Sequence, residues 1–479
     1  MTTTHEPTLF EKSRPGRTGY SIPTCAASAS DLPAELARET AVELPELSEV
    51  DVVRHYTRLS QRNFGIDLGM YPLGSCTMKY NPRINEATAR YSGFAKLHPH
   101  TPPTQAQGAL ALMHELQNML AEISGLGAVS LQPAAGAHGE MTGLMVIRAY
   151  HTKNGNPRKK VLIPDTAHGT NPASSTICNY EVETVGSDAH GGIDLDALAA
   201  KMNEDVAALM ITNPNTLGLF ESRIAEAAKI VHDRGGLVYC DGANLNAILG
   251  ITRPGDFGAD VMHINLHKTF TTPHGGGGPG AGPVAVRDFL APFLPVPAIV
   301  KTANGYDWDY DRPDSVGKVH AFFGNFGMLV RAYTYIREMG AKGLAKVSAM
   351  AVLNATYIKE SLKDVYHLAY DEPCMHECVL SDKGMPGGVT TMDIAKRLMD
   401  YGFHPPTVYF PLIVKGSIMI EPTETESLEN CDRFIEAMKE IRRDAETNPD
   451  MIHEAPHHAP VTRLNDVQAA KRMRLTADL

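Results

Sequence analysis

Five short apolar segments between residues 161 and 264 constrain the fold of this chain more than any other feature. They are Val161–Pro164, Val182–Val185, Ala207–Ile211, Leu237–Cys240 and Val261–Ile264. Helical segments accompany them near residues 140–151, 194–202 and 221–234, the last closed by Gly235 and Gly236. Strands that are apolar throughout and alternate with helices are typical of mostly parallel sheets covered on both faces. The pattern therefore predicts an α/β protein with a doubly wound, mostly parallel sheet.

The regions on either side of these segments have a different character. We expect residues 1–104 to form an N-terminal arm and a loop segment, and residues 105–315 to form the large domain. A helix capped by Thr104 is expected to run through Leu110 and Ile123 and to end at Gly125. Residues 316–450 are expected to form a smaller α+β domain, with helices near 325–363 and 426–446 and strands at 379–380 and 418–420. Residues 451–479 are expected to form a tail.

Composition excludes several classes of protein. The chain has 479 residues and a net charge of −11, which argues against a dedicated nucleic-acid binder. Seven cysteines are too few for a disulfide scaffold, and an odd number fits reduced thiols. We see no secretory signal and no apolar run of the roughly 20 residues that span a bilayer. We expect a cytoplasmic enzyme that binds neither membrane nor nucleic acid.

Polar side chains follow four of the predicted strands at the point where each strand ends. His168 follows the first strand, and Asn213 and Thr216 follow the third. Asp241 and Asn244 follow the fourth, and Lys268 follows the fifth. Ligands of open α/β sheets bind beyond the carboxyl ends of the strands, so these side chains are expected to meet at one edge.

This set of residues favours pyridoxal phosphate as the cofactor. A lysine can form a Schiff base with the cofactor aldehyde, which is the role expected for Lys268. An aspartate can pair with the pyridinium nitrogen, the role expected for Asp241, and an imidazole such as His168 can cover the ring. Six glycines within Gly275–Gly282 follow the lysine, but they do not match the phosphate-loop pattern of nucleotide-binding proteins.

The cofactor phosphate is expected at the start of a helix, where backbone N–H groups point outward. The run Gln132–Glu140 has the small residues that such a site requires, and Gly136, Ala137 and His138 are its candidate ligands. His267 flanks the lysine and is a further candidate. Asn213, Thr216 and Asn244 are candidates for a hydrogen bond to the cofactor hydroxyl.

Several of these segments resemble the P-protein family of the glycine cleavage system. They are Met70–Pro82, Gln132–Glu140, Asp165–Asn171, Asp241–Asn244 and Asn265–Phe270. The resemblance covers roughly residues 20–470, and the length is similar to that of the catalytic subunit 2 of the two-subunit bacterial form. It implies a fold-type I pyridoxal phosphate enzyme with a seven-stranded type of large sheet, a smaller C-terminal domain and an N-terminal arm.

The resemblance also implies a reaction and its partners. Glycine would lose CO2, and its aminomethyl group would pass to the lipoyl arm of H-protein, the activity of an aminomethyl-transferring glycine dehydrogenase. The partner would be a homologous subunit 1, in an α2β2 heterotetramer. Glycine has no side chain to grip, so Tyr71, Ser75, Cys76 and Thr77 are expected to wall the substrate site and exclude larger amino acids.

Two alternatives remain open from the sequence. The chain could be another fold-type I enzyme, either desulfurase-like or amino-acid-decarboxylase-like, although no cysteine stands out as a catalytic thiol. It could also be a non-catalytic subunit that docks H-protein, a hypothesis that Lys268 and Asp241 argue against. Cys374 and Cys378, with His376 between them, lack the spacing of a zinc site, so no metal is expected.

Overall fold

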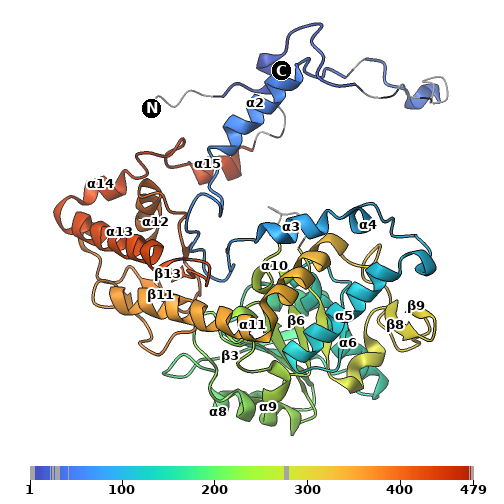
Figure 1. The fold of residues 1–479 in the computed structure, drawn as a ribbon. Coiled ribbons are helices and arrows are strands. Elements are labelled where there is room, and N and C mark those ends of the chain that lie inside the picture. Colours follow the sequence, from blue (N-terminus) through green and yellow to red (C-terminus); the bar gives the residue numbers. More distant parts are fainter. Residues whose placement is uncertain are drawn as a thin grey trace. The chain divides into compact units, whose positions relative to one another are not determined.

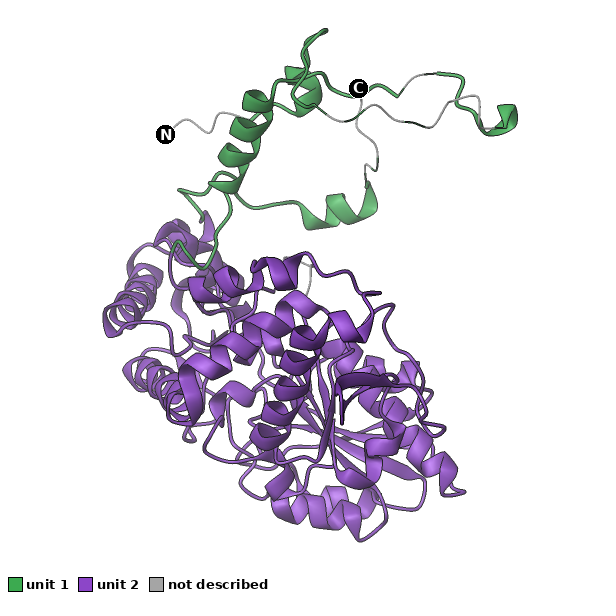
Figure 2. Cartoon of the chain, turned by 45° about the vertical axis from the view of Figure 1, so that its right-hand side comes forward, with its two compact units in different colours: residues 1–68, 456–479 green, residues 69–455 purple. Residues whose placement is uncertain are grey.

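The computed structural model describes residues 6–21, 23, 26, 33–40, 42–274, 280–473 and 475. Gly275–Pro279, which hold most of the glycine run after Lys268, lie outside the described residues. The chain divides into two compact units (Figure 2), Met1–Leu68 with Pro456–Leu479, and Gly69–Ala455. Every residue of the candidate site belongs to the second unit.

The first unit contains short helices joined by extended chain. They are α1 (Leu9–Lys12), the 3-10 turn η2 (Ala34–Leu36), α2 (Glu49–Ser60) and α15 (Asp466–Lys471). The longest, α2, begins at Ser48, whose side chain accepts a hydrogen bond from the N–H of Asp51.

A seven-stranded sheet forms the centre of the second unit (Figure 1). Its strands lie in the order β1 (Ala128–Ser130), β7 (Val284–Val286), β6 (Val261–Ile264), β5 (Leu237–Gly242), β4 (Val206–Thr212), β2 (Lys160–Pro164) and β3 (Glu181–Val185). Strands β2 to β6 are parallel, and β7 runs antiparallel to both of its neighbours. The five strands predicted from the apolar segments, and the mostly parallel sheet, are confirmed.

Helices cover both faces of this sheet because its strands are apolar on both sides. On β4, Ala208 and Met210 pack with α6 (Gly136–Lys153). Leu209 and Ile211 point the other way and pack with α8 (Leu195–Lys201) and α9 (Ile224–His232). The alternation of side chains along a strand thus produces a two-sided core.

Helix α5 (Gln107–Ser124) differs from the prediction at its start. Its N-cap is Ala106, whereas Thr104 lies in the separate 3-10 turn η3 (Pro103–Gln105). The expected cap at Thr104 is therefore wrong, because the turn at Pro102–Pro103 precedes the helix instead of opening it. The helix ends at Gly125, as expected, in the left-handed conformation (φ 70°).

The long helix α11 (Phe326–Leu362) connects two hydrophobic cores. Met328 and Leu329 pack in the core beneath α5, whereas Ile358 and Leu362 pack in the core of the smaller sheet. The helix is broken at the exposed Gly340, whose backbone (φ 59°, ψ 179°) is not helical. Leu344 and Val347, beyond the break, still pack in the first core, so the helix passes to the second core between Val347 and Ala355.

The smaller sheet is antiparallel and follows α11 in the chain. Its order is β10 (His367–Leu368), β11 (Cys378–Ser381), β13 (Ser417–Ile420) and β12 (Thr407–Val408). Helices α12 (Thr391–Asp400), α13 (Leu428–Thr447) and α14 (Pro449–His453) complete this part. Leu73 bridges to Ile420, so the segment before α3 (Arg83–Ala89) is attached to this sheet.

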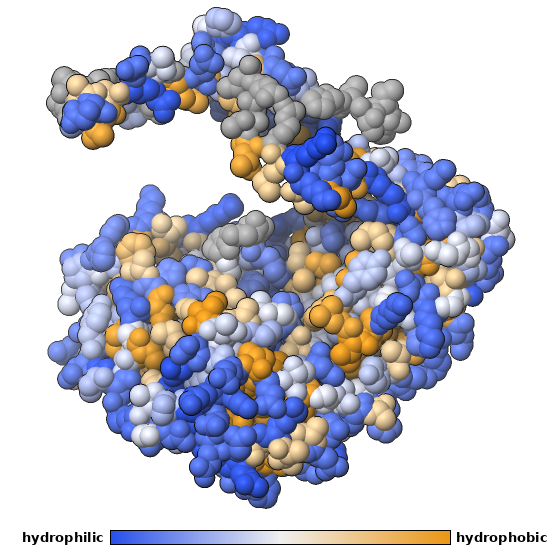
Figure 3. Space-filling view, turned by 180° about the vertical axis from the view of Figure 1, so that it is seen from behind, coloured by the Kyte–Doolittle hydropathy of each residue, from blue (hydrophilic) through white to orange (hydrophobic). Residues whose placement is uncertain are grey.

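Connecting segments complete the second unit. They are α4 (Ser92–Ala95), α7 (Thr170–Ile177), the hairpin of β8 (Ala298–Thr302) and β9 (Gly305–Asp309), and α10 (Leu266–Thr269), which carries Lys268. On the face drawn in Figure 3, apolar side chains occur in small groups among polar ones. None of the helices in the described part of the chain combines the length and the apolar character needed to cross a membrane.

Replacement of Gly143 by alanine is expected to lower the free energy of unfolding. A Cβ at this buried position of α6 would lie 2.5 Å from Cε2 of Tyr239, a fully buried ring whose hydroxyl bonds to His263. Such overpacking costs about 1–3 kcal/mol. Urea unfolding followed by circular dichroism measures the loss. Gly108→Ala is the control, because nothing lies within 4 Å of its Cβ and the substitution favours α5. Equal stability of both variants would contradict the close packing of α6 on β5.

Candidate active site

A cavity of about 270 Å³ lies at the carboxyl ends of the parallel strands. Its lining includes most of the candidate residues from the sequence: Ser75, Gly136, Ala137, His168, Thr216, Asp241, Asn244, His267 and Lys268. The remaining candidates, Tyr71, Cys76, Thr77, His138 and Asn213, are not among the lining residues. Side chains from four strand ends therefore meet at one place, as the parallel sheet predicts.

Lys268 reaches this cavity from the short helix α10. Its Nζ donates a hydrogen bond to the carbonyl oxygen of Ser75 at 2.7 Å. The helix itself is held by Lys79, a buried lysine whose Nζ donates to the carbonyl of Thr269 at 2.9 Å and to Glu424 at 2.6 Å. Lys79 is thereby occupied, and Lys268 is the lysine that lines the cavity.

Asp241 is a buried carboxylate at the end of β5, 3% exposed. Its Oδ2 accepts from Asn171 at 3.0 Å and its Oδ1 from the N–H of Ala243 at 2.9 Å, while Nε2 of His263 lies 3.3 Å away. Burial opposes ionisation, but His263 and these two hydrogen bonds outweigh it and lower the pKa of Asp241 below its usual value. A stable negative charge therefore faces the cavity.

His168 lies on the loop between β2 and α7 and is exposed at the cavity. Its Nδ1 is 2.9 Å from Oγ1 of Thr170, whose hydroxyl donates to the buried Glu140 at 2.8 Å. The surrounding protein removes part of the hydration of the ring, and this desolvation, followed by the charge of Lys268, lowers the pKa of His168. The imidazole is thus held in place by its neighbours and favoured in the neutral form.

The start of α6 is shaped to receive an anion. No side chain caps this end of the 18-residue helix, so its first N–H groups are free of a cap. A Cβ on Gly136 would lie 2.6 Å from Oδ1 of Asn265, and one on Gly282 would lie 2.0 Å from the carbonyl oxygen of Ala135. Only glycine permits the start of α6 to lie this close to Asn265 and to Gly282.

The ring of His138 makes contacts outside the cavity. Its Nδ1 accepts from the N–H of Ala134 at 3.1 Å, and its ring stacks on His320 with centroids 6.4 Å apart. His267, in contrast, lines the cavity and accepts from the N–H of Ala281 at 3.4 Å.

Buried polar atoms without partners surround the cavity. Oγ1 of Thr212, Oδ1 of Asn244 and Oδ1 of Asn265 line it and have no hydrogen-bond partner among the described residues. Nδ2 of Asn213, the residue after Thr212, has no partner among the described residues either. The hydroxyl of Thr216 donates to the carbonyl of Thr166, and its oxygen can still accept a hydrogen bond in the cavity. Buried polar groups are normally paired, so these atoms mark a place for a polar ligand.

The segment around Ser75 closes one side of the cavity. Ser75 and Thr77 have left-handed backbone conformations (φ 63° and 49°), which are costly for residues with a Cβ. The carbonyl of Cys76 accepts from Nε2 of His274 at 2.9 Å, and burial raises the pKa of its thiol. Tyr71 lies further out, stacked on His404 with ring centroids 3.7 Å apart.

Several lining residues were not singled out from the sequence. They are Ala135, Glu140, Thr170, Thr212, Ala243, His263 and Asn265. Glu140, Thr170 and Asn265 lie within the segments Gln132–Glu140, Asp165–Asn171 and Asn265–Phe270. Their position in these segments could have identified them from the sequence. His263 lies inside a strand, where the apolar pattern hides it, yet it pairs with Asp241.

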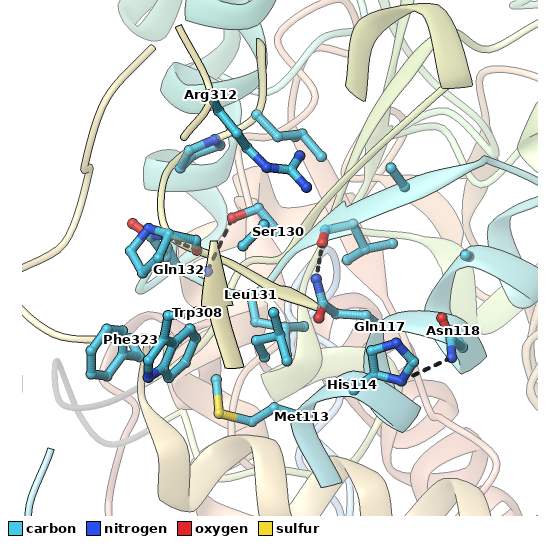
Figure 4. A pocket seen from close by; sticks show the side chains of 18 of the residues that line it. Met113, His114, Gln117, Asn118, Ser130, Leu131, Gln132, Trp308, Arg312 and Phe323 are labelled. Carbon is cyan, nitrogen blue, oxygen red and sulfur yellow. Dashed lines mark hydrogen bonds between the residues drawn. The ribbon is translucent and has the colours of Figure 1, made fainter. Parts of the chain in front are cut away.

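A second cavity of about 190 Å³ lies between α5, β1 and the β8–β9 hairpin (Figure 4). It shares no lining residue with the Lys268 cavity. Trp308 and Phe323 stack at 4.0 Å along one side, and Gln132 hydrogen-bonds to the carbonyl of Pro297 at 3.2 Å. Its arginine, Arg312, is paired with Asp309 at 2.9 Å. The groups suited to catalysis therefore belong to the first cavity.

The fold and the site define a class of enzyme. The structure of a glycine decarboxylase (P-protein) of the glycine cleavage system superposes with a TM-score of 0.73 at 22% identity, over 86% of this chain and 93% of that one. A glutamate decarboxylase from Lactobacillus brevis gives a TM-score of 0.66 at 14% identity, over 88% and 98% of the two chains. The fold is that of the fold-type I pyridoxal phosphate enzymes.

Sequence comparison gives the family. The family described as Glycine cleavage system P-protein matches residues 26–301, and Glycine dehydrogenase, C-terminal domain, matches residues 347–459. A probable glycine dehydrogenase (decarboxylating) subunit 2 from Halalkalibacterium halodurans is 58% identical over 97% of this chain and 96% of its own. One from Exiguobacterium sibiricum is 58% identical over 98% and 97%. The chain belongs to the glycine cleavage system P-protein family.

His267 is expected to bind a proton when the protein unfolds at acidic pH. Burial, and then the charges of His274 and Lys268, lower the pKa of this imidazole from 6.5 to about 3. Between these values the unfolded state binds more protons than the folded state, so the stability falls as the pH decreases from 6.5 toward 3. The His267→Asn variant should take up about one proton fewer on unfolding in this pH range. The slope of the unfolding free energy against pH measures this number. Parallel curves for both proteins would contradict a neutral, buried His267.

Proposed function

We propose that this chain is the catalytic subunit of a two-subunit glycine dehydrogenase (decarboxylating) of the aminomethyl-transferring type. It would use pyridoxal phosphate to release CO2 from glycine and pass the aminomethyl group to the lipoyl arm of H-protein. The observation that carries the proposal is the convergence of Lys268 and the charged Asp241 on one cavity beside the uncapped start of α6.

The residues present fit this cofactor. The free N–H groups of α6, with the glycine contacts at Gly136 and Gly282, suit its phosphate. The unpartnered atoms of Asn213, Asn244 and Thr212 offer hydrogen bonds to its polar substituents. Asp241 supplies a fixed negative charge for the ring nitrogen, and His168 an exposed imidazole for the ring face. When bound, the cofactor would accept the electrons of the bond to the departing carboxylate.

The protein's own groups would perform four tasks. Asp241, kept ionised by His263, would hold a proton on the ring nitrogen. Lys268 would hold the cofactor covalently and yield that place to glycine. The carbonyl of Ser75, 2.7 Å from Nζ, would receive the displaced amine. The segment from Tyr71 to Thr77 would restrict the space beside the substrate.

Two alternatives are weaker. A NifS-like protein and cysteine desulfurases share the fold at 16% identity or less. Similarity at this level indicates a common fold and not a common reaction. A subunit that only docks H-protein would not need Lys268 in a cavity with a buried charge. The partner subunit is part of the proposal and is supported by the subunit 2 names of the relatives. The H-protein and the α2β2 assembly are proposed from the resemblance alone.

Lys268→Ala is expected to abolish covalent attachment of the cofactor and to reduce glycine–CO2 exchange by about three orders of magnitude or more. Borohydride reduction followed by peptide mass spectrometry locates the attachment in the wild-type protein. Exchange is assayed with the partner subunit and lipoylated H-protein. Lys301→Ala, at an exposed lysine, is the control and should behave as wild type. Attachment elsewhere, or exchange by the Lys268 variant, would refute the proposal.

Asp241→Asn is expected to reduce turnover by about two to four orders of magnitude, because the ring nitrogen would lose its anionic partner. Asparagine keeps the size of the side chain and one acceptor for the N–H of Ala243, so the variant should still fold. Circular dichroism and steady-state kinetics measure the two effects. Undiminished turnover in a folded variant would contradict the role of Asp241.

A further inference from the structure

Two buried glutamates hold the backbone of the turn that faces Lys268. Oε2 of Glu377 accepts a hydrogen bond from the N–H of Ser75 at 2.7 Å. Oε2 of Glu421 accepts one from the N–H of Thr77 at 2.8 Å. The two glutamates lie at the ends of neighbouring strands of the smaller sheet, some 300 residues away in the chain. Distant parts of the sequence therefore meet at this turn.

The turn would not keep its shape unaided. Ser75 and Thr77 both have positive φ, and neither is a glycine. Such conformations persist where the surrounding structure holds them. Here each strained residue donates its N–H to one glutamate, and the hydroxyl of Thr407 donates to the carbonyl of the preceding Gly74 at 2.7 Å. The result is a fixed direction for the two carbonyls of Ser75 and Cys76.

Those carbonyls accept hydrogen bonds from two side chains, and one of them, Lys268, lines the cavity. The oxygen of Ser75 accepts from Nζ of Lys268 at 2.7 Å, and the oxygen of Cys76 accepts from Nε2 of His274 at 2.9 Å. Glu377 is therefore connected to Lys268 through the backbone of one residue, Ser75.

Both carboxyl groups are fully buried, at 0% exposure, as is His376 beside them. One ligand atom from each of these three side chains lies within 4.8 Å of the other two. Burial raises the pKa of both glutamates, and the charge of Glu421 raises that of Glu377 further. Two carboxyl groups this close do not both ionise readily, and the protonated form of Glu377 is favoured.

We propose that Glu377 and Glu421 are positioning residues that clamp the turn at Ser75–Thr77, so that the Ser75 carbonyl is the docking point for the amine of Lys268. The effect of the clamp on catalysis rests on the proposed function. The hydrogen bonds that form the clamp do not depend on that function. Among the described residues Glu377 accepts through one oxygen, so a glutamine can replace it with its amide oxygen. The second oxygen of Glu421 also accepts, from Nδ2 of Asn246 at 3.3 Å.

A metal ion is the competing explanation for the cluster. His376 has no hydrogen-bond partner on either ring nitrogen among the described residues, and Oε1 of Glu377 has none. Nε2 of His376 lies 3.7 Å from Oε1 of Glu377. We favour the clamp over a metal site because both glutamates already accept a backbone N–H through one oxygen, and the other oxygen of Glu421 accepts from Nδ2 of Asn246 at 3.3 Å.

Hydrogen–deuterium exchange of the full-length, cofactor-free protein tests the clamp directly. In Glu377→Ala, amides in the peptide around Ser75 and Thr77 should exchange at least about tenfold faster than in the wild type. Glu377→Gln should restore most of the protection. Asp382→Ala is the matched control, because Asp382 also accepts a backbone hydrogen bond, from Thr391 at 2.9 Å, but does not contact the turn. It should leave this peptide unchanged.

Kinetics of the loaded enzyme give the second measurement. Glu377→Ala should keep the cofactor reducible onto Lys268 while kcat for glycine falls about tenfold or more, and Glu377→Gln should recover most of kcat. If the wild-type protein did not attach the cofactor at Lys268, the proposed function would be refuted. The hydrogen–deuterium exchange experiment would still decide whether the clamp exists.

Three results would overturn the clamp. One is unchanged exchange around Ser75 in Glu377→Ala and in Glu421→Ala. Another is equal loss of protection in Asp382→Ala, which would show a general loss of stability. The third is one equivalent of tightly bound metal in the purified protein that disappears in Glu377→Gln.

Discussion

A single negative charge buried at the end of β5 organises the candidate site. Asp241 stays ionised at 3% exposure because His263, Asn171 and the N–H of Ala243 each stabilise the carboxylate. His263 is in turn oriented by the hydroxyl of Tyr239 at 2.8 Å. These groups come from β5, β6 and α7, so the position of the charge depends on the register of the parallel strands. The sheet thus determines the electrostatics of the cavity as well as its location.

The opposite side of the cavity depends on contacts that are distant in sequence. Residues 70–77 lie against the smaller sheet through the bridge between Leu73 and Ile420 and through Glu377 and Glu421. Lys79 adds a buried contact to α10, the helix that carries Lys268. The site is therefore closed by a segment whose backbone is held from two directions, by the large part and by the smaller sheet.

Much of this arrangement was predictable from the residues. The five apolar strands, the polar residues at their ends and the sites of Lys268 and Asp241 follow from local patterns and from the geometry of parallel sheets. The short strands β1 and β7 were missed, because three residues carry too little periodicity. His138 turned to Ala134 and His320, which no local pattern indicates. Glu377 and Glu421 were missed because their partners lie 302 and 344 residues away.

Gly340 shows that exposure is a poor guide to mutational tolerance in this chain. It is on the surface of α11 and nothing lies within 4 Å of where its Cβ would be. Its backbone nevertheless occupies a region that is essentially restricted to glycine. Any other residue would be strained here and would favour one continuous helix, which would displace Leu344 and Val347 from the first core and Ile358 from the second. Substitutions here would be harmful through the chain path alone, without touching a neighbour.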